Sequence, residues 1–161
     1  MIRLRQILVP IDFGEASEVA LDYGRALART FGASLHAVHV MENSFMRPSA
    51  LDPYQLKTAA VTRLHQRLTD DDRATLHAHA VLETSDNPAE EIVKYAKAHA
   101  IDLIVMGTHG RGAMAQLLVG SVAERVVRTA PCPVLTVRHP EHEFIVPDTD
   151  STASQQAGGA S

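Results

Sequence analysis

Hydrophobic residues fall into two alternating kinds of segment along the chain, short apolar runs and longer stretches with helical spacing. The short runs, rich in Val, Ile and Leu, predict strands at residues 7–11, 34–41, 76–82, 102–106 and 132–137. The longer stretches predict helices at about residues 14–31, 54–68, 88–99 and 121–129. Strands that alternate with helices favour an α/β fold. We therefore expect one open, mainly parallel five-stranded sheet with helices on both faces, a Rossmann-like arrangement.

Residues typical of helix ends support these boundaries. Gly32 is a stop signal for the first helix, while Asn87 and Pro88 are a capping residue and a first-turn residue for the third. Residues 42–53 contain two prolines and no clear period, so we expect a loop there. The acidic run at residues 70–72 is expected to be the solvated end of the second helix.

The periodic pattern stops at Arg138, and residues 151–161 are rich in Ser, Ala, Gly and Gln. A chain of 161 residues is within the usual size of one domain. We therefore expect a folded domain at residues 1–138 and a disordered C-terminal tail at residues 139–161.

Charge and composition narrow the classes of function. The net charge is −4 with no dense basic cluster, which argues against a nucleic-acid-binding surface. The N-terminal residues contain no apolar stretch long enough for a signal peptide or a membrane helix. We therefore expect a cytoplasmic protein without a membrane partner. The single cysteine, Cys132, excludes an internal disulfide, and its position between two prolines at a strand start indicates a packing role.

A glycine-rich segment follows the fourth predicted strand. Gly107, Gly110 and Gly112 lie within six positions, and Gly120 directly precedes Ser121 at the start of the last helix. Glycines allow the backbone to approach an anion closely, and the free amides of a helix start attract it. The arrangement therefore predicts a phosphate-binding loop, although it is neither a Walker A motif nor G-x-G-x-x-G. The alternative is that these glycines only permit tight turns.

The spacing Gly107-x-x-Gly110, nine residues, then Gly120-Ser121 resembles the nucleotide-binding branch of the universal stress protein family. The resemblance covers residues 1 to about 138. It implies the strand order 3-2-1-4-5, which places the first and fourth strands side by side. Ligands of such sheets bind at the carboxyl ends of the strands, where the strand order reverses. Asp12 and Gly107 would then face one cleft.

The resemblance also implies a ligand, ATP with Mg²⁺, and a set of binding residues. The adenine side would consist of strand-end apolar residues, namely Pro10, Ile11, Val40 and Met106. The phosphate side would consist of Gly107, Gly110, Gly120, Ser121 and Val122, with His109 and Arg111 in the loop. Asp12 would contact the ribose.

Several of these residues have a plainer alternative. Asp12 could cap the first helix, although Gly14 stands where many relatives carry Ser or Thr, which weakens that cap. The apolar strand-end residues could be ordinary core, and Arg111 could be a solvated loop residue.

The sequence contains no recognisable catalytic set. Asp12 and His109 are the only acid–base groups expected near the phosphates, and neither has an evident partner. Among the nine histidines, His77 and His79 are expected to share a strand face, whereas His36 and His39 are expected to point to opposite faces. No metal site held by protein ligands is expected, and a Mg²⁺ would be carried by nucleotide phosphates.

The favoured hypothesis is an ATP-binding regulatory module of the stress response with at most slow hydrolysis. The alternatives are a structural or interaction dimer of the same family without nucleotide, and a slow ATPase or adenylyl-transfer enzyme. We also expect a homodimer through the edge strand from Pro133 to Val137, because proteins rarely leave such an edge open. A second possibility is that residues 144–146 fold back and cover this edge.

Overall fold

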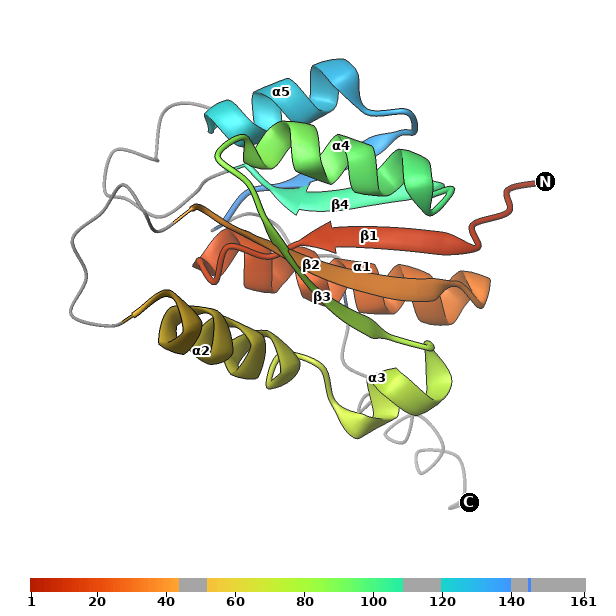
Figure 1. The fold of residues 1–161 in the computed structure, drawn as a ribbon. Coiled ribbons are helices and arrows are strands. Elements are labelled where there is room, and N and C mark those ends of the chain that lie inside the picture. Colours follow the sequence, from red (N-terminus) through yellow and green to blue (C-terminus); the bar gives the residue numbers. More distant parts are fainter. Residues whose placement is uncertain (44–51, 109–119, 140–144, 146–161) are drawn as a thin grey trace, which may run out of the picture.

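The computed structural model describes residues 1–43, 52–108, 120–139 and 145. Its strands are β1 (Gln6–Pro10), β2 (Ser34–Met41), β3 (His79–Thr84), β4 (Leu103–Gly107) and β5 (Val134–Val137). All neighbouring strands pair in parallel, in the order β3-β2-β1-β4-β5 (Figure 1). The expected fold class and strand order are confirmed.

Helices cover both faces of the sheet. The helices are α1 (Glu15–Phe31), α2 (Pro53–His65), α3 (Asp70–Thr75), α4 (Pro88–Ala98) and α5 (Ser121–Thr129). Figure 1 shows α4 and α5 side by side on one face, and α1 with α2 on the other. Within the described part of the chain, no helix is long and apolar enough to cross a membrane.

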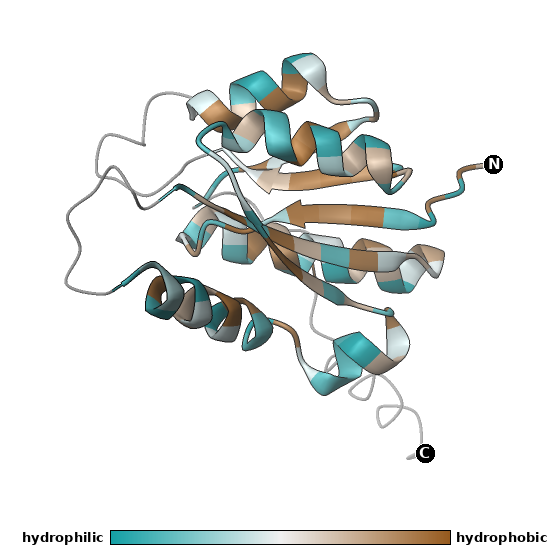
Figure 2. Cartoon of the chain, in the orientation of Figure 1, coloured by the Kyte–Doolittle hydropathy of each residue, from teal (hydrophilic) through white to brown (hydrophobic). Residues whose placement is uncertain are grey.

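The two faces of β1 carry two separate hydrophobic clusters. Ile7 and Val9 pack on the α1 side, whereas Leu8 packs on the side of α4 and α5, and all three are fully buried. Figure 2 shows this continuous hydrophobic character along β1 and β4. A strand buried on both faces has no polar alternation, which explains why short unbroken apolar runs marked these strands.

The predicted helix ends at Gly32 and Asn87 are confirmed. Gly32 adopts a left-handed conformation with φ of 65° and donates its N–H to the carbonyl of Ala28. Asn87 accepts a hydrogen bond from the N–H of Glu90 through its side chain, and Pro88 is the first residue of α4. Both are ordinary ways to satisfy the backbone groups that a helix end leaves without partners.

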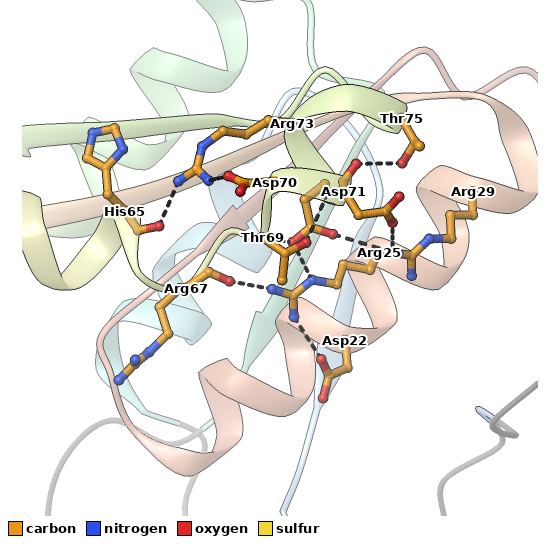
Figure 3. A network of polar contacts seen from close by, with 11 residues as sticks. Asp22, Arg25, Arg29, His65, Arg67, Thr69, Asp70, Asp71, Arg73 and Thr75 are labelled. Carbon is orange, nitrogen blue, oxygen red and sulfur yellow. Dashed lines mark hydrogen bonds and ion pairs between the residues drawn. The ribbon is translucent and has the colours of Figure 1, made fainter.

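The acidic run at residues 70–72 begins a helix, so its interpretation as a solvated helix end was wrong. Asp72 is completely buried, and it forms a reciprocal cap with Thr69 at the start of α3. Its carboxylate is 2.9 Å from Nε of Arg25 and 3.5 Å from Nη2 of Arg29. Figure 3 labels both arginines, which lie on α1. Arg25 also donates to the carbonyl of Arg67. Charged pairs therefore attach α3 to α1.

The environment of Asp72 affects its protonation in two opposing ways. Burial by itself raises the pKa of the carboxyl group, because the charged form loses its hydration. The hydrogen bonds from Thr69 and the Arg25 guanidinium outweigh burial, so the pKa is lowered. The carboxylate is therefore held in its charged form.

The third strand begins later than predicted. Leu76 is the buried residue that ends α3, and His77, between α3 and β3, has a φ of 46°. His77 and His79 therefore do not share a strand face, and that prediction was wrong. His36 and His39 do point to opposite faces of β2, as expected: His36 contacts Tyr95 of α4, and His39 contacts Phe13 on the α1 side.

His36 is a buried histidine with both ring nitrogens engaged. Nδ1 is 2.8 Å from the hydroxyl of Tyr95, and Nε2 is 2.7 Å from Oε1 of Gln6. The rings of His79 and His99 lie 5.0 Å and 5.9 Å away. Burial, together with the charges of these two histidines, lowers the pKa of His36 from 6.5 to about 4.

This shift predicts an acid-sensitive stability. Between pH 6.5 and about 4 the unfolded chain protonates His36 while the folded chain does not. The free energy of unfolding should therefore fall as the pH falls through this window, by about 3 kcal/mol in all. Denaturant titrations of the unmutated chain and His36→Gln at several pH values measure the difference. The exposed His65→Gln is the control, and an equal pH dependence for all three proteins would contradict this account.

Candidate functional site

A pocket of about 300 Å³ opens at the carboxyl ends of β1, β2 and β4. Nine of the residues selected from the sequence line it, namely Pro10, Ile11, Asp12, Val40, Met106, Gly107, Gly120, Ser121 and Val122. The other three, His109, Gly110 and Arg111, lie outside the described residues. The structure thus brings strand ends and a helix start together around one cavity.

The pocket also contains residues that the sequence analysis did not select. They come mainly from neighbouring turns and helices and are Ser17, Val38, His39, Glu42, Pro88, Ile92, Thr108 and Ala123. Ala123 directly follows Val122 at the start of α5, so the strand–loop–helix pattern could have indicated it. Ser17 lies in the first turn of α1, five positions after Asp12, and no sequence signal marked it. Pro88 and Ile92 belong to α4, whose approach to the pocket depends on packing between α4 and α5.

Asp12 occupies a tightly bonded turn between β1 and α1. Its Oδ1 accepts a hydrogen bond from the N–H of Gly14 at 2.8 Å. The hydroxyl of Ser17 donates to the carbonyl of Gly14 at 3.0 Å and lies 3.4 Å from the N–H of Asp12. The residue that caps α1 is Gly14, which makes no side-chain capping bond. Asp12 therefore shapes the turn before the helix, and the alternative that it caps α1 is not what the geometry shows.

Gly107 lies where the first turn of α1 packs against the end of β4. A Cβ at this position would be 2.8 Å from both the carbonyl carbon and the Cβ of Ala16, and 3.0 Å from the N of Ser17. Real Cβ atoms do not approach backbone so closely. A glycine is therefore required here by helix–strand packing, independently of any ligand.

The start of α5 provides the polar end of the pocket. The N–H of Gly120 donates to the carbonyl of Thr108 at 2.6 Å, which holds the helix start beside β4. Ser121, Val122 and Ala123 form the first turn of α5 and line the pocket. The first amides of a helix have no partner within it and carry the positive end of its dipole. The arrangement can therefore receive an anion.

Among the described pocket residues, the titratable groups lie on β2 or shortly after β1 and β2. They are Asp12 after β1, His39 on β2 and Glu42 after β2. Nδ1 of His39 lies 2.6 Å from the carbonyl of Ile11 and donates to it, because a carbonyl can only accept. In the part of the chain that the structure describes, no three His, Cys, Asp or Glu residues lie close enough together to hold a metal ion.

Cys132 lies outside the pocket. It packs against the hydrophobic cluster on the side of α4 and α5. Burial raises the pKa of its thiol, and the nearby Asp102 adds to this effect. A thiol with a raised pKa is a poor nucleophile.

A model of the universal stress protein family matches residues 3–138 of the chain. The chain belongs to this family. A relative, universal stress protein MJ0531 of Methanocaldococcus jannaschii, is 31% identical over 147 residues, which cover 86% of this chain and 85% of the relative. The solved structure of universal stress protein UspA from Lactobacillus plantarum is 30% identical with a TM-score of 0.68. It matches over 86% of this chain and 100% of its own.

Two more distant family structures contain adenine nucleotides. One is a universal stress protein in complex with cAMP, 22% identical with a TM-score of 0.61, matching over 84% of this chain and 98% of its own. The other is the universal stress protein from Archaeoglobus fulgidus in complex with dAMP, 22% identical with a TM-score of 0.55, matching over 85% and 99%. At this identity they establish a shared fold with the present chain.

The packing at Gly107 predicts a change that reaches the pocket. In Gly107→Ala the new methyl group must displace the first turn of α1, and overpacking of this kind costs about 1–3 kcal/mol. We expect a lower free energy of unfolding together with shifted amide resonances for Asp12 and Ser17.

Gly32→Ala is the matched control for that substitution. No atom lies within 4 Å of the new Cβ, but the φ of 65° is strained for alanine. This variant should lose stability without moving the resonances of Asp12 and Ser17. If Gly107→Ala leaves both stability and these resonances unchanged, the close contact does not exist in solution.

Proposed function

We propose that this chain binds an adenine nucleotide, ATP with Mg²⁺, and acts in the stress response as a nucleotide-dependent regulatory module. The observation that carries the proposal is that the carboxylate residue Asp12, after β1, and the first turn of α5 line one pocket of about 300 Å³. The cAMP and dAMP complexes of distant family members support an adenine nucleotide as the ligand class.

The pocket offers a separate surface for each part of a nucleotide. Apolar side chains at the strand ends, including Ile11, Val40 and Met106, suit the flat adenine ring. The carboxylate of Asp12 suits the ribose hydroxyls, which donate hydrogen bonds. The first turn of α5, with the Ser121 hydroxyl, suits the phosphates. Gly110, His109 and Arg111, from the adjoining loop, are proposed to complete the phosphate side.

A Mg²⁺ ion fits this charge distribution. Asp12 and Glu42 place two carboxylates in a pocket that would also receive a polyphosphate, so a cation is needed to offset the repulsion. Mg²⁺ is commonly held by substrate phosphates with one or two carboxylates and several waters. It would therefore arrive with the nucleotide.

We expect the chain to hydrolyse the bound nucleotide slowly at most. Of the described pocket residues, only His39, Asp12 and Glu42 can transfer protons. Nδ1 of His39 is engaged by the carbonyl of Ile11, and Oδ1 of Asp12 by the N–H of Gly14. Both groups are thus fixed in structural bonds, which favours binding over catalysis.

The two ends of the ligand can be separated by substitution. Asp12→Ala should weaken ATP, ADP and AMP by similar factors, because the ribose is common to all three. Ser121→Ala should weaken the binding of ATP more than that of AMP, because Ser121 is proposed to contact the phosphate chain, and the nucleotides differ only in that chain. The loss of one hydrogen bond to a charged group corresponds to about ten- to a hundredfold in affinity.

Calorimetric titration of both variants with the three nucleotides tests this arrangement, with Asp70→Ala on α3 as a control that should bind like the unmutated chain. If Ser121→Ala weakens ATP and AMP equally, and Asp12→Ala weakens ATP more than AMP, the ligand lies the other way round, with its phosphates toward Asp12. No binding of millimolar ATP to the unmutated chain would refute the function itself.

The edge position of β5 supports a homodimer through residues Pro133 to Val137. Among the described strands, β5 is the last of the sheet and pairs with β4. The carbonyl of Pro133 accepts a hydrogen bond from the N–H of Ile104 in β4 at 3.1 Å, and the carbonyl of Val137 accepts one from Thr108, directly after β4, at 2.9 Å. By the alternation of a parallel ladder, the backbone groups of Thr136 then point away from the sheet. A second copy could pair with them.

Light scattering should therefore give a dimer both for the full chain and for a chain truncated after Arg138. Thr136→Pro should give a folded monomer, since it removes an outward N–H without breaking the pairing with β4. A monomer for both the full and the truncated chain would exclude the dimer. A dimer formed only after truncation would show that residues 144–146 cover the edge.

A further inference from the structure

Phe13 adopts a backbone conformation that is rare for a large aromatic residue. Its φ is 65°, in the left-handed region that favours glycine. It lies between Asp12, which lines the pocket, and Gly14, which caps the start of α1. Strained residues persist only where their surroundings hold them, and they are concentrated at functional sites.

The ring of Phe13 is held from two further elements. The ring of His39 on β2 lies 4.6 Å away, between centroids, and its own position is fixed by the hydrogen bond to the carbonyl of Ile11. The guanidinium carbon of Arg63 on α2 lies 4.2 Å from the centre of the Phe13 ring. Arg67 lies at 5.8 Å and is attached to α1 by an ion pair with Glu18 at 2.6 Å.

Arg63 itself does not line the pocket. Its side chain lies on an exposed part of α2, and its contact with the site passes through the Phe13 ring. Cations over an aromatic ring are attracted by the negative face of the π-system. The contact holds the Phe13 ring against α2. It thereby fixes the backbone of Phe13, which directly follows Asp12.

We propose that Phe13 is a positioning residue: held between His39 and Arg63, it fixes the left-handed turn that presents the Asp12 carboxylate to the pocket. Arg63 then sets the affinity for the ribose part of the ligand without contacting it. This last consequence rests on the proposed nucleotide-binding function, whereas the geometry of the turn does not depend on it.

Arg63→Met is the informative variant, because it removes the charge, keeps a long apolar side chain and changes an exposed position that should not prevent folding. Lys57→Met, also exposed on α2, is the matched control, and Arg63→Lys keeps a cation in place. The first measurement uses the chain without ligand. It follows hydrogen exchange of the Gly14 amide, which is bonded to Asp12, with the amide of Gly24 inside α1 as the internal reference.

The turn is expected to loosen in Arg63→Met. The Gly14 amide should exchange about 2- to 5-fold faster, with Gly24 unchanged, because a cation–ring contact at an exposed site has about that effect on an equilibrium. Lys57→Met should match the unmutated chain, and Arg63→Lys should fall between the two.

The second measurement is the affinity for AMP. Arg63→Met should lose about 2- to 5-fold in the unmutated background and nothing further in the Asp12→Ala background, because the effect acts through Asp12. If Arg63 had a purely structural role, Arg63→Met would lower stability, and its effect on AMP affinity would not depend on Asp12.

Three results would overturn the proposal. Unchanged Gly14 exchange in folded Arg63→Met would show that the ring contact does not hold the turn. Faster exchange of the Gly14 amide in Arg63→Met with an unchanged AMP affinity would show that Phe13 packs locally but does not position Asp12 for the ligand. An equal loss of affinity with and without Asp12 would mean that Arg63 acts on the ligand directly. If the unmutated chain binds no AMP or ATP, the proposed function fails, and Gly14 exchange alone still decides whether the ring fixes the turn.

Discussion

The contact between the first turn of α1 and the end of β4 is the constraint on which the pocket depends. No side chain fits at Gly107, because a Cβ there would lie 2.8 Å from the backbone of Ala16. This close approach brings the Asp12 turn beside the strand end, while the parallel pairing of β1 with β4 places both ends at the same edge. The pocket is therefore formed by the packing of the domain itself.

Periodicity was sufficient to predict most elements but not how they pair. Runs such as 102–106 marked strands because their side chains are buried on both faces, whereas the strand order came from the family resemblance. α3 was missed because its six residues carry no apolar period. Its buried Asp72 is bonded to Arg25, 47 positions away in the chain, and such a partner leaves no local signal. The start of β3 was misplaced because Leu76 continues the alternation but in fact ends α3.

The pocket likewise contains some residues that the neighbouring sequence marks and others that only tertiary packing brings there. The glycines and Ser121 at the start of α5 follow from a strand–loop–helix pattern, whereas the apolar residues at the strand ends came from the family resemblance. Nine of the selected residues line one pocket. Pro88 and Ile92 could not be selected, because α4 reaches the pocket only through the three-dimensional packing of the helices. The role of Phe13 was equally hidden, since a positive φ at a phenylalanine contradicts the local preference and is maintained by side chains of β2 and α2.

The central claim is that the pocket at the carboxyl ends of β1, β2 and β4 binds an adenine nucleotide. The most direct measurement is a two-dimensional NMR titration of the labelled chain with ATP and Mg²⁺. The account predicts that amide resonances of Asp12, Val40, Gly107 and Ser121 shift together in one saturable process, while those of α3 stay in place. Absence of shifts at millimolar ATP, or shifts confined to residues outside the pocket, would contradict it.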